Sequence, residues 1–441
     1  MEIYVVQPGD SVYSIAGRYG ISFIKLILDN GLENINSLVP GQAILIAYPS
    51  LTYTVKEGDS LKSIADTYGV SLSQLLRNNP YLAERTYIYK GETLTISYNT
   101  VGKMTTNGFI FPFVDREILR KTLPYLTYLT IYNYRITSSG DLLSYFDDSE
   151  IIQIAKEYGT IPLMMATTFS PEGEPDIESM FNLLLSEEYQ EKQINTMLNV
   201  IKEKGYYGVN FIFNYINVIN QKLYQSFLTK VYNRLSDEGY LVFATINPKI
   251  NNINNEIYYE KIDYSAISQV VNYIIFLELI WGTNFEPPEP VSSIRNLKTF
   301  MDYVTNQIPP EKAVIGMPVI GYDWVLPHIP GISKASALTI NSAINLANDV
   351  GATIQFDEVS QTPFYYYYSI ENGLLVQHIV WFIDARSISA LTNLFSEYGL
   401  SGTGIWSVMT FLSQLWTVLN TQYDIEKFLP ENTDSLNLYV L

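Results

Sequence analysis

The strand-like stretch GVNFIFN, residues 208–214, places polar side chains at a spacing that could serve a chemical site. Residues i and i+2 of a strand share a face, so Asn210, Ile212 and Asn214 point the same way. A carboxamide donates and accepts hydrogen bonds but has no proton to release at any useful pH, and an isoleucine side chain can do neither. This face can therefore bind or pack, but it offers no general acid for cleaving a bond.

Residue counts exclude other chemistries. The chain has no cysteine, which rules out disulfides and thiolate metal sites, and two histidines, His328 and His378, argue against a His-based zinc site. The formal net charge of −18 argues against nucleic acid, whose phosphates need clustered Lys and Arg, and against a polybasic membrane anchor. We therefore expect no metal, no cofactor and no nucleic-acid partner.

The beginning of the chain, MEIYVVQPGDSVYSIAG, has no basic segment followed by an apolar one, as a signal peptide would. The sequence also has no apolar run long enough to cross a membrane. We expect a soluble product that is made without a signal peptide and has no membrane span.

The first hundred residues contain a repeat. YVVQPGDSVYSIAGRYGISFIKLILDN (4–30) aligns with YTVKEGDSLKSIADTYGVSLSQLLRNN (53–79). In each copy an alternating strand turns at Gly-Asp, a serine begins a helix, and a second helix follows. PGQAILI (40–46) or KGETLTI (90–96) then supplies a closing strand. The pattern predicts a βααβ unit of roughly 45 residues that is used twice.

From about residue 105, apolar strands alternate with amphipathic helices such as EEYQEKQINTMLNVIKEKG. The eight strand candidates are NGFIFPF, YLTIYNYRI, IPLMMATTF, GVNFIFN, YLVFATINP, VVNYIIFLELI, AVIGMPVIG and GTGIWSVM. Eight such units predict an α/β fold, a (β/α)8 TIM barrel whose site lies at the carboxyl ends of the strands. Residues 322–390 are too long for one crossover and contain further strand-like runs, so we expect a small α+β subdomain inserted there.

The repeated unit resembles the LysM module, over residues 2–47 and again over 51–98. LysM modules bind N-acetylglucosamine-containing glycans such as peptidoglycan and chitin. The resemblance implies that the sugar lies between the loop after the first strand and the loop before the last. For any one residue of these loops, the alternative role is a turn or a helix cap. The matching positions are Gly9, Asp10, Ser11, Asp29 and Asn30 in the first unit, and Gly58, Asp59, Ser60, Asn78 and Asn79 in the second.

Residues 104–428 resemble the barrel of the family-18 glycoside hydrolases, in particular the spore cortex-lytic N-acetylglucosaminidases that carry tandem N-terminal LysM modules. The motifs that carry the resemblance are GYYGVNFIFNYI at the fourth strand, IGMPVIGYDWVLP at the seventh, VWFIDARS in the insertion and GIWSVMTFLSQLWTVLNTQYDIEKF near the end. Residues 429–441 form a tail beyond the family's usual end.

The resemblance implies a substrate-assisted reaction, which departs from the usual two-carboxylate schemes. The fourth strand of the family carries the signature D-x-x-D-x-D-x-E. Its final Glu protonates the leaving oxygen, and the Asp two residues before it orients the substrate's acetamide, whose carbonyl oxygen attacks the anomeric carbon. A Tyr at the end of the sixth strand helps to hold that acetamide.

This chain lacks the residues that such a reaction needs. The acid position holds an asparagine, the orienting position an isoleucine and the tyrosine position a leucine. Because the replacements are spread over three strands, we predict natural decay to a pseudoenzyme. The degenerate positions are Tyr207, Asn210, Ile212, Asn214, Leu279 and Ile383.

Other residues remain as candidate glycan contacts at the barrel mouth. Asp323 and Asp384 match the subgroup, and we expect them to hydrogen bond or bind a ligand rather than to act as a rebuilt acid. Trp406 ends the eighth strand, where the family's tryptophan forms the floor of the subsite for the acetylated sugar. We expect Glu278, which strand alternation turns away from the face of Leu279, to be structural. The full set of candidates is Trp281, Tyr322, Asp323, Trp324, Asp384 and Trp406.

Three functional hypotheses follow. The first is a non-catalytic protein of the bacterial spore envelope or cell wall that binds peptidoglycan or another N-acetylglucosamine-containing glycan and uses a decayed barrel for binding or assembly. The second is an active cortex-lytic N-acetylglucosaminidase with relocated acids. The third is a self-assembling coat component, in which the tail LPENTDSLNLYVL adds to a neighbour's sheet edge. For the tail itself we slightly prefer a strand that closes the chain's own barrel.

Overall fold

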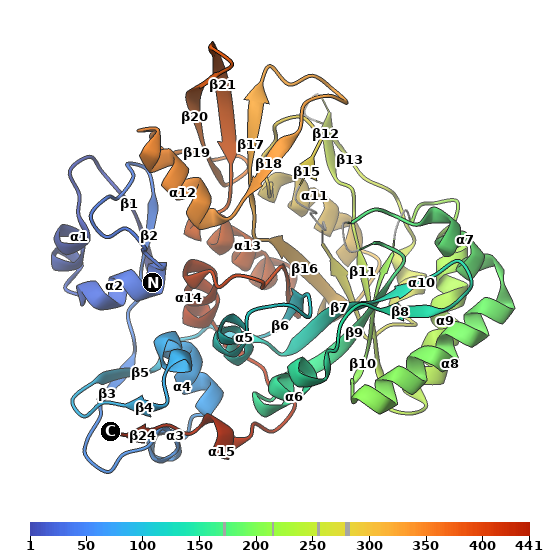
Figure 1. Cartoon of the computed structure of the whole chain (residues 1–441), viewed down its shortest axis with the longest axis horizontal. Helices are drawn as coiled ribbons and strands as arrows, with labels where there is room; N and C mark the ends of the chain where they lie inside the picture. The colour runs from blue at the N-terminus through green and yellow to red at the C-terminus, as the bar shows by residue number, and fades with distance from the viewer. Residues whose placement is uncertain (171–172, 214–215, 254–255, 278–282) are drawn as a thin grey trace.

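The computed structural model describes residues 1–170, 173–213, 216–253, 256–277 and 283–441. It contains two small N-terminal modules, a barrel and an antiparallel sheet above the barrel (Figure 1). Four residues singled out above lie outside the described residues: Asn214, Glu278, Leu279 and Trp281. Among the helices that the structure does describe, none has both the length and the apolar character that crossing a bilayer requires.

Each N-terminal module is a βααβ unit, as the repeat predicts. The first consists of β1 (Glu2–Val5), α1 (Val12–Tyr19), α2 (Phe23–Asn30) and β2 (Ala43–Ile46), and the second of β3 (Leu51–Thr54), α3 (Leu61–Tyr68), α4 (Leu72–Asn78), the 3-10 turn η1 (Pro80–Glu84), β4 (Tyr87–Ile88) and β5 (Thr93–Ser97). Ser11 and Ser60 begin the first helix of each module with a capping box. Gly9 and Gly58 have φ angles of 88° and 86°, which glycine adopts without strain.

Eight parallel strands close into a barrel, which confirms the predicted TIM fold. Around the ring they are β6 (Gly102–Ile110), β7 (Tyr128–Ile136), β9 (Ile161–Thr167), β10 (Gly208–Phe213), β11 (Leu241–Ile246), β14 (Tyr273–Phe276), β16 (Ala313–Pro318) and β22 (Gly402–Trp406). The ring is complete because β6 pairs with both β22 and β7.

Helices cover the outside of the barrel. They are α5 (Arg116–Thr122), α6 (Ser149–Glu157), α7 (Ile177–Leu185), α8 (Glu187–Lys204), α9 (Gln221–Ser236), α10 (Tyr264–Ser268), α11 (Ile294–Thr305), α13 (Ala385–Tyr398) and α14 (Ser413–Gln422). The shorter elements are η2 (Leu123–Tyr125), η3 (Pro310–Lys312), β8 (Leu142–Ser144), β12 (Asn251–Ile253), β13 (Glu256–Tyr258) and β23 (Tyr423–Ile425).

A six-stranded antiparallel sheet stands above the barrel, in the order β15–β18–β17–β21–β20–β19 (Figure 1). Its strands are β15 (Thr283–Asn284), β17 (Gly321–Leu326), β18 (Ala335–Leu338), β19 (Gln355–Asp357), β20 (Thr362–Glu371) and β21 (Leu374–Trp381), and α12 (Ile340–Asp349) accompanies them. All of these except β15 lie between β16 and α13, which confirms the predicted α+β insertion.

The last segment of the chain returns to the second module (Figure 1). Here α15 (Thr433–Leu436) is followed by β24 (Tyr439–Val440), which pairs in parallel with β4. The preference for a tail strand that closes the barrel is therefore wrong, since β22 and β6 close it and the tail lies on another part of the molecule.

Helix α14 fixes both modules on the barrel through a row of polar side chains. Gln414, Thr417 and Asn420 are spaced three residues apart and so lie on one face of the helix. Gln414 donates to the side chain of Asn30 at 3.0 Å, and Asn420 donates to the side chain of Asn78 at 2.7 Å. Thr417 donates to the Asp29 carbonyl at 3.0 Å. One helix therefore binds equivalent ends of the two modules.

A buried arginine completes the contact with the second module. Nε of Arg77 donates to Oδ1 of Asn420 at 3.0 Å, and the hydroxyl of Tyr125 donates to the Arg77 carbonyl at 2.5 Å. Burial lowers the pKa of the Arg77 guanidinium to about 10, because the charged form is the one that loses hydration. The cation still carries its charge at neutral pH, so its polar partners in the interface are costly to remove.

We predict that Asn420→Ala lowers the free energy of unfolding by about 1–3 kcal/mol, because Asn78 and Arg77 lose a buried hydrogen-bond partner. Urea unfolding measures the change. The control is Asn199→Ala, at an exposed helical position, which should stay within about 0.5 kcal/mol of the parent. Equal effects of the two substitutions would contradict the role assigned to the row on α14.

Candidate functional site

Asn210 lies inside the barrel and is fully buried. Its Nδ2 donates to Oγ1 of Thr130 on β7 at 3.2 Å, and its Oδ1 accepts from Oγ1 of Thr245 on β11 at 2.9 Å. Thr130 in turn donates to Oδ1 of Asn107 on β6 at 2.8 Å. These side chains form a polar layer across four strands, so the amide of Asn210 is used to hold the barrel together.

Ile212 occupies the next inward position and is 3% exposed. Alternation along β10 is as predicted, since Phe211 packs outward on Phe227 of α9 with 5.4 Å between ring centroids. The apolar cluster around Ile212 consists of Phe109, Tyr128, Tyr132, Ile161, Leu163, Met165, Phe243, Ile275, Leu277, Val314 and Trp406. The barrel fills its own interior at the position where the family orients the acetamide.

Trp406 belongs to this filling and is 6% exposed. Its ring centroid lies 5.7 Å from that of Phe109 and 6.1 Å from that of Phe111. Nearby, Gly316 permits the close approach of Leu277, because a Cβ on that glycine would lie 2.4 Å from Cβ of Leu277. Trp406 therefore packs against neighbouring side chains of the barrel.

Tyr207 precedes β10 and therefore lies at the opposite, amino-terminal end of the barrel strands. Its side chain is 38% exposed, and the ammonium of Lys156 lies 5.5 Å from the centroid of its ring. The structure thus separates Tyr207 from Asn210 and Ile212.

A cavity of about 190 Å³ opens near the carboxyl ends of the barrel strands, beside the inserted sheet. Tyr322 and Trp324 line it, and the indole N–H of Trp324 donates to the Glu286 carbonyl at 3.0 Å. Glu289 also lines it, and its pKa is raised by burial and further by the charge of Glu286. The residues around the cavity are Asn247, Pro248, Ile250, Asn251, Phe276, Glu286, Pro287, Glu289, Pro290, Val291, Ser292, Ser293, Asn296, Leu297, Gly316, Pro318, Tyr322 and Trp324. Glu289 was not found from the sequence, because nothing local distinguishes it from other loop carboxylates.

Asp323 does not line the cavity, since it alternates with Tyr322 and Trp324 on β17. Its carboxylate accepts from the hydroxyl of Tyr367 at 2.6 Å and lies 3.0 Å from Nδ1 of His378. Burial raises the pKa of the Tyr367 hydroxyl, and the hydrogen bond to Asp323 adds to the rise. Asp323 therefore makes hydrogen bonds within the inserted sheet.

Asp384 begins α13 and also lies away from the cavity. Its carboxylate accepts from the Arg386 amide at 2.8 Å and forms an ion pair with the Arg386 guanidinium at 2.7 Å. The same guanidinium donates to the Gly41 carbonyl of the first module at 3.2 Å. Ile383 is fully buried in the core. The Asp384–Arg386 ion pair therefore lies at the contact between the barrel and the first module.

The Gly-Asp-Ser loops of the two modules have the same geometry. Asp10 accepts from the Gln7 amide at 2.8 Å and from the Tyr4 hydroxyl at 2.5 Å. Asp59 accepts from the Lys56 amide at 2.7 Å and from a tyrosine hydroxyl at 2.8 Å. Both carboxylates hold the loop in shape, and the serine that follows each caps a helix. The structure thus shows these side chains in structural bonds, and the glycan contact of the loops stays a prediction.

The four residues at the ends of α2 and α4 are placed differently from the expectation. Asn30 and Asn79 are buried, and each bonds the preceding helix to the closing strand: Asn30 to the backbone of Leu26 and Leu45, and Asn79 to that of Leu75 and Thr95. Asp29 pairs with Lys25 at 2.9 Å, and Asn78 donates to the Ile96 carbonyl at 2.7 Å. In the structure these side chains support the module and its contact with α14, and their role as glycan contacts stays a prediction.

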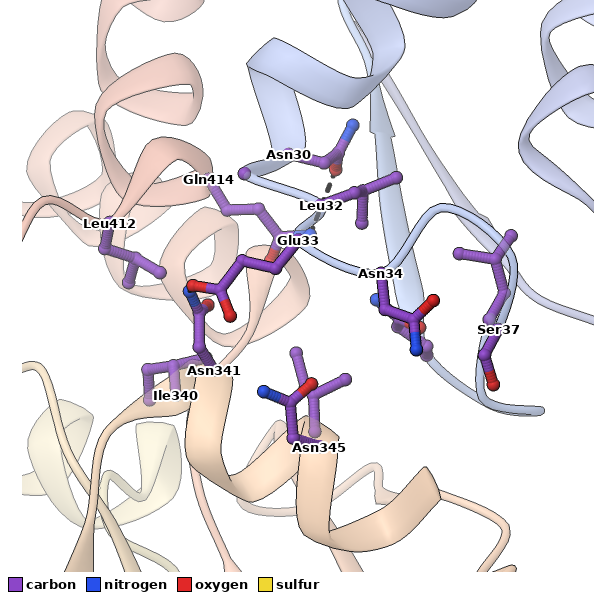
Figure 2. A pocket seen from close by; sticks show the side chains of 14 residues that line it. Asn30, Leu32, Glu33, Asn34, Ser37, Ile340, Asn341, Asn345, Leu412 and Gln414 are labelled. Atoms are coloured by element: carbon purple, nitrogen blue, oxygen red, sulfur yellow. Dashed lines mark hydrogen bonds between the residues drawn. The ribbon is translucent and has the colours of Figure 1, made fainter. Parts of the chain in front are cut away.

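A second, smaller cavity of about 30 Å³ lies between the first module and the barrel. Figure 2 shows Glu33 beside Asn341, whose Nδ2 donates to the carboxylate at 2.6 Å, and the bond between Asn30 and Gln414 behind them. A volume of this size holds roughly one or two waters, so it is too small for a sugar ring.

Comparison with known proteins agrees with this architecture. The description "Glycosyl hydrolases family 18" matches residues 126–410, and the LysM domain matches residues 4–47 and 53–97. The fold and site thus define a LysM-bearing family-18 barrel, and the chain belongs to glycosyl hydrolases family 18.

Three of the similar proteins come from Bacillus. The cortical fragment-lytic enzyme of Bacillus anthracis is 32% identical over 434 residues, covering 97% of this chain and 99% of that protein. The solved spore cortex-lytic enzyme SleL of Bacillus cereus is 31% identical with a TM-score of 0.77, over 97% of this chain and 99% of that one. The Bacillus megaterium QM B1551 enzyme SleL is 30% identical with a TM-score of 0.77, over 96% and 98%.

We predict that Ile212→Asp lowers the free energy of unfolding at pH 7 by about 3–5 kcal/mol, because the carboxylate enters a filled apolar interior. Burial raises the pKa of this new group in the folded state, so the deficit is largest above that raised pKa and shrinks as the pH falls toward the unfolded pKa. Denaturant unfolding between pH 4 and pH 8 measures it. The control Ile212→Val should cost about 0.5–1.5 kcal/mol. A cost for Asp no larger than that for Val would contradict a filled interior.

Proposed function

We propose that this protein is a non-catalytic binder of peptidoglycan or another N-acetylglucosamine-containing glycan in the bacterial spore envelope. The observation that carries the proposal is the pair Ile212 and Asn214. The first residue is packed among apolar side chains at the position of the family's orienting Asp, and the second has an amide in place of the acid. General acid catalysis alone contributes roughly 10²–10⁴-fold to such reactions, and its orienting partner is replaced as well.

The binding role rests on the modules and the relatives. Two LysM domains are present, and LysM modules are glycan-binding units. The relatives are named for spore cortex, whose degradation they carry out. A spore-envelope location, in cortex, coat or exosporium, and contacts with other envelope proteins are parts of this proposal.

The second candidate function is an active cortex-lytic enzyme with a relocated acid. The names of the relatives favour it, and so does Glu289. This carboxyl lines the cavity that Tyr322 and Trp324 share, and its raised pKa suits a group that must hold a proton. Asp323 and Asp384 are poorer candidates because both are engaged in the bonds described above.

We predict that the protein releases no fragments from purified spore cortex or from chitin oligosaccharides, because position 214 cannot supply a proton. Mass spectrometry of the soluble products tests this, with the Bacillus cereus cortex-lytic enzyme as the positive control. Fragment release that disappears in Glu289→Gln would establish the second candidate in place of the first.

We also predict that Asn214→Glu alone does not restore hydrolysis. The acid would return, but the acetamide would still meet apolar surface at Ile212, and orientation in such reactions contributes several kcal/mol. The comparison is the triple variant that adds Ile212→Asp and Leu279→Tyr, with circular dichroism confirming that each variant is folded. If the single variant cleaves chitin oligosaccharides nearly as fast as the triple variant, the barrel has lost less of its catalytic machinery than the replacements indicate.

A further inference from the structure

The tail of the chain lies as an extended strand in the second module, between two of its loops. On one side β24 pairs with β4, with Tyr439 opposite Tyr87 and Val440 opposite Ile88. On the other side Tyr439 bridges to Ser60 in antiparallel fashion. The tail thus fills the gap between the Gly-Asp-Ser loop and the segment before the closing strand.

Backbone hydrogen bonds hold the tail on both sides of this gap. The Leu61 amide donates to the Leu438 carbonyl at 2.8 Å, and the Val440 amide donates to the Asp59 carbonyl at 3.2 Å. Across the gap, the Leu441 amide donates to the Ile88 carbonyl at 3.0 Å. β24 and β4 together form a two-stranded sheet, and main-chain bonds hold the tail as they hold a bound extended peptide.

Side chains add to the attachment. Leu438 and Val440 pack against the main hydrophobic core, and Leu436 just before them is 4% exposed. Oδ1 of Asn437 accepts from the Lys62 amide at 2.9 Å. Further upstream, the carboxylate of Glu431 accepts from the first two amides of α4, at 2.7 and 2.9 Å, where the helix dipole favours a negative charge. These contacts together hold the chain from Glu431 onward on the second module.

The first module has the same loops without such an occupant. The repeat places Asp10, Val12 and Leu38 at the positions of Asp59, Leu61 and Ile88. Within the described part of the chain, no hydrogen bond satisfies the carbonyls of Asp10 and Leu38 or the amide of Val12. In the same part of the chain no strand pairs with the segment around Leu38 in the way that β24 pairs with β4. The backbone groups that bond to the tail in the second module have equivalents in the first module that are open to a ligand.

We propose that residues 437–441 are an internal ligand of the second LysM groove, so that the protein with its tail docked offers one glycan site, in the first module. This inference rests on the proposed glycan-binding function. Because the tail is part of the same chain, its effective concentration at the groove is high, and an external oligosaccharide must displace it. Release of the tail would open a second site and convert a monovalent binder of glycan into a bivalent one.

Three variants of the full chain test the proposal. Leu438→Asp with Val440→Asp removes the apolar attachment and should release the tail. Tyr439→Ser is the matched control, because that side chain is 65% exposed. Tyr87→Cys with Tyr439→Cys joins neighbouring strands, whose spacing suits a disulfide, and the chain contains no other cysteine.

Isothermal titration with an N-acetylglucosamine tetramer counts the sites, and amide hydrogen exchange at Leu61 and Leu441 reports whether the tail is docked. We expect one tetramer per chain for the parent, the Tyr439→Ser control and the oxidised disulfide variant. We expect two for the released variant, with exchange at Leu61 at least tenfold faster.

Two results would overturn the inference while leaving the proposed function intact: a released variant that still binds one tetramer, or a parent that binds two while the Leu61 amide stays protected. Absence of tetramer binding by every form would refute the proposed glycan function, and the occlusion of a glycan site would fall with it. Fast exchange of Leu61 in the parent would show that the tail is not docked.

Discussion

The contact between α14 and the two modules is the constraint on which the arrangement of the molecule depends. A single face of this helix bonds the ends of α2 and α4, and the buried Arg77 ties the second contact to the barrel wall. Since these groups are buried, separating a module from the barrel would leave polar atoms without partners, which costs more than each bond contributes when it is made. The modules are therefore held in fixed positions, and any glycan that they bind is held in a fixed place relative to the barrel.

The same contact gives the asparagines at the helix ends a structural role. Asn30 and Asn78 bond both within their modules and to α14, so a sugar could reach them only by breaking the interface. The backbone of the loops lies next to them. In the second module the tail already bonds to that backbone, and Glu431 joins the tail to the start of α4 beside the interface. The contact of the modules with α14 and the contact of the tail with the second module therefore lie next to each other.

The inward residues of β10 are held by the side chains around them. Asn210 remains in the interior because two threonines match its amide, and Ile212 remains because the neighbouring side chains are apolar. A filled interior stabilises the fold through burial, whereas an open polar mouth requires water and charged groups. A cavity lies to one side of this filled interior, and Tyr322 and Trp324 give it aromatic surface.

The repeat, the eight strands and the insertion could be predicted from the sequence because each follows a local pattern. Apolar residues recur about every two residues in strands and every 3.6 residues in helices, and Gly-Asp-Ser recurs in the two modules. The docked tail could not, because its partner strand lies some 350 residues earlier and nothing local identifies the pairing. The roles of Asn30 and Asp384 were also beyond prediction. A polar residue at a helix end is equally suited to a cap, a ligand or a buried interface, and only the packing partner decides between them.

The incorporation of oxygen from water measures whether the barrel cleaves glycans, which we propose it does not do. Hydrolysis of a glycosidic bond in H₂¹⁸O labels each new reducing end, so a single turnover per chain is detectable by mass spectrometry. The account predicts that cortex or chitin oligosaccharides incubated with the parent protein carry no more label than those in buffer alone, while the Bacillus cereus enzyme labels them fully. Label that increases with the concentration of the parent protein would contradict it.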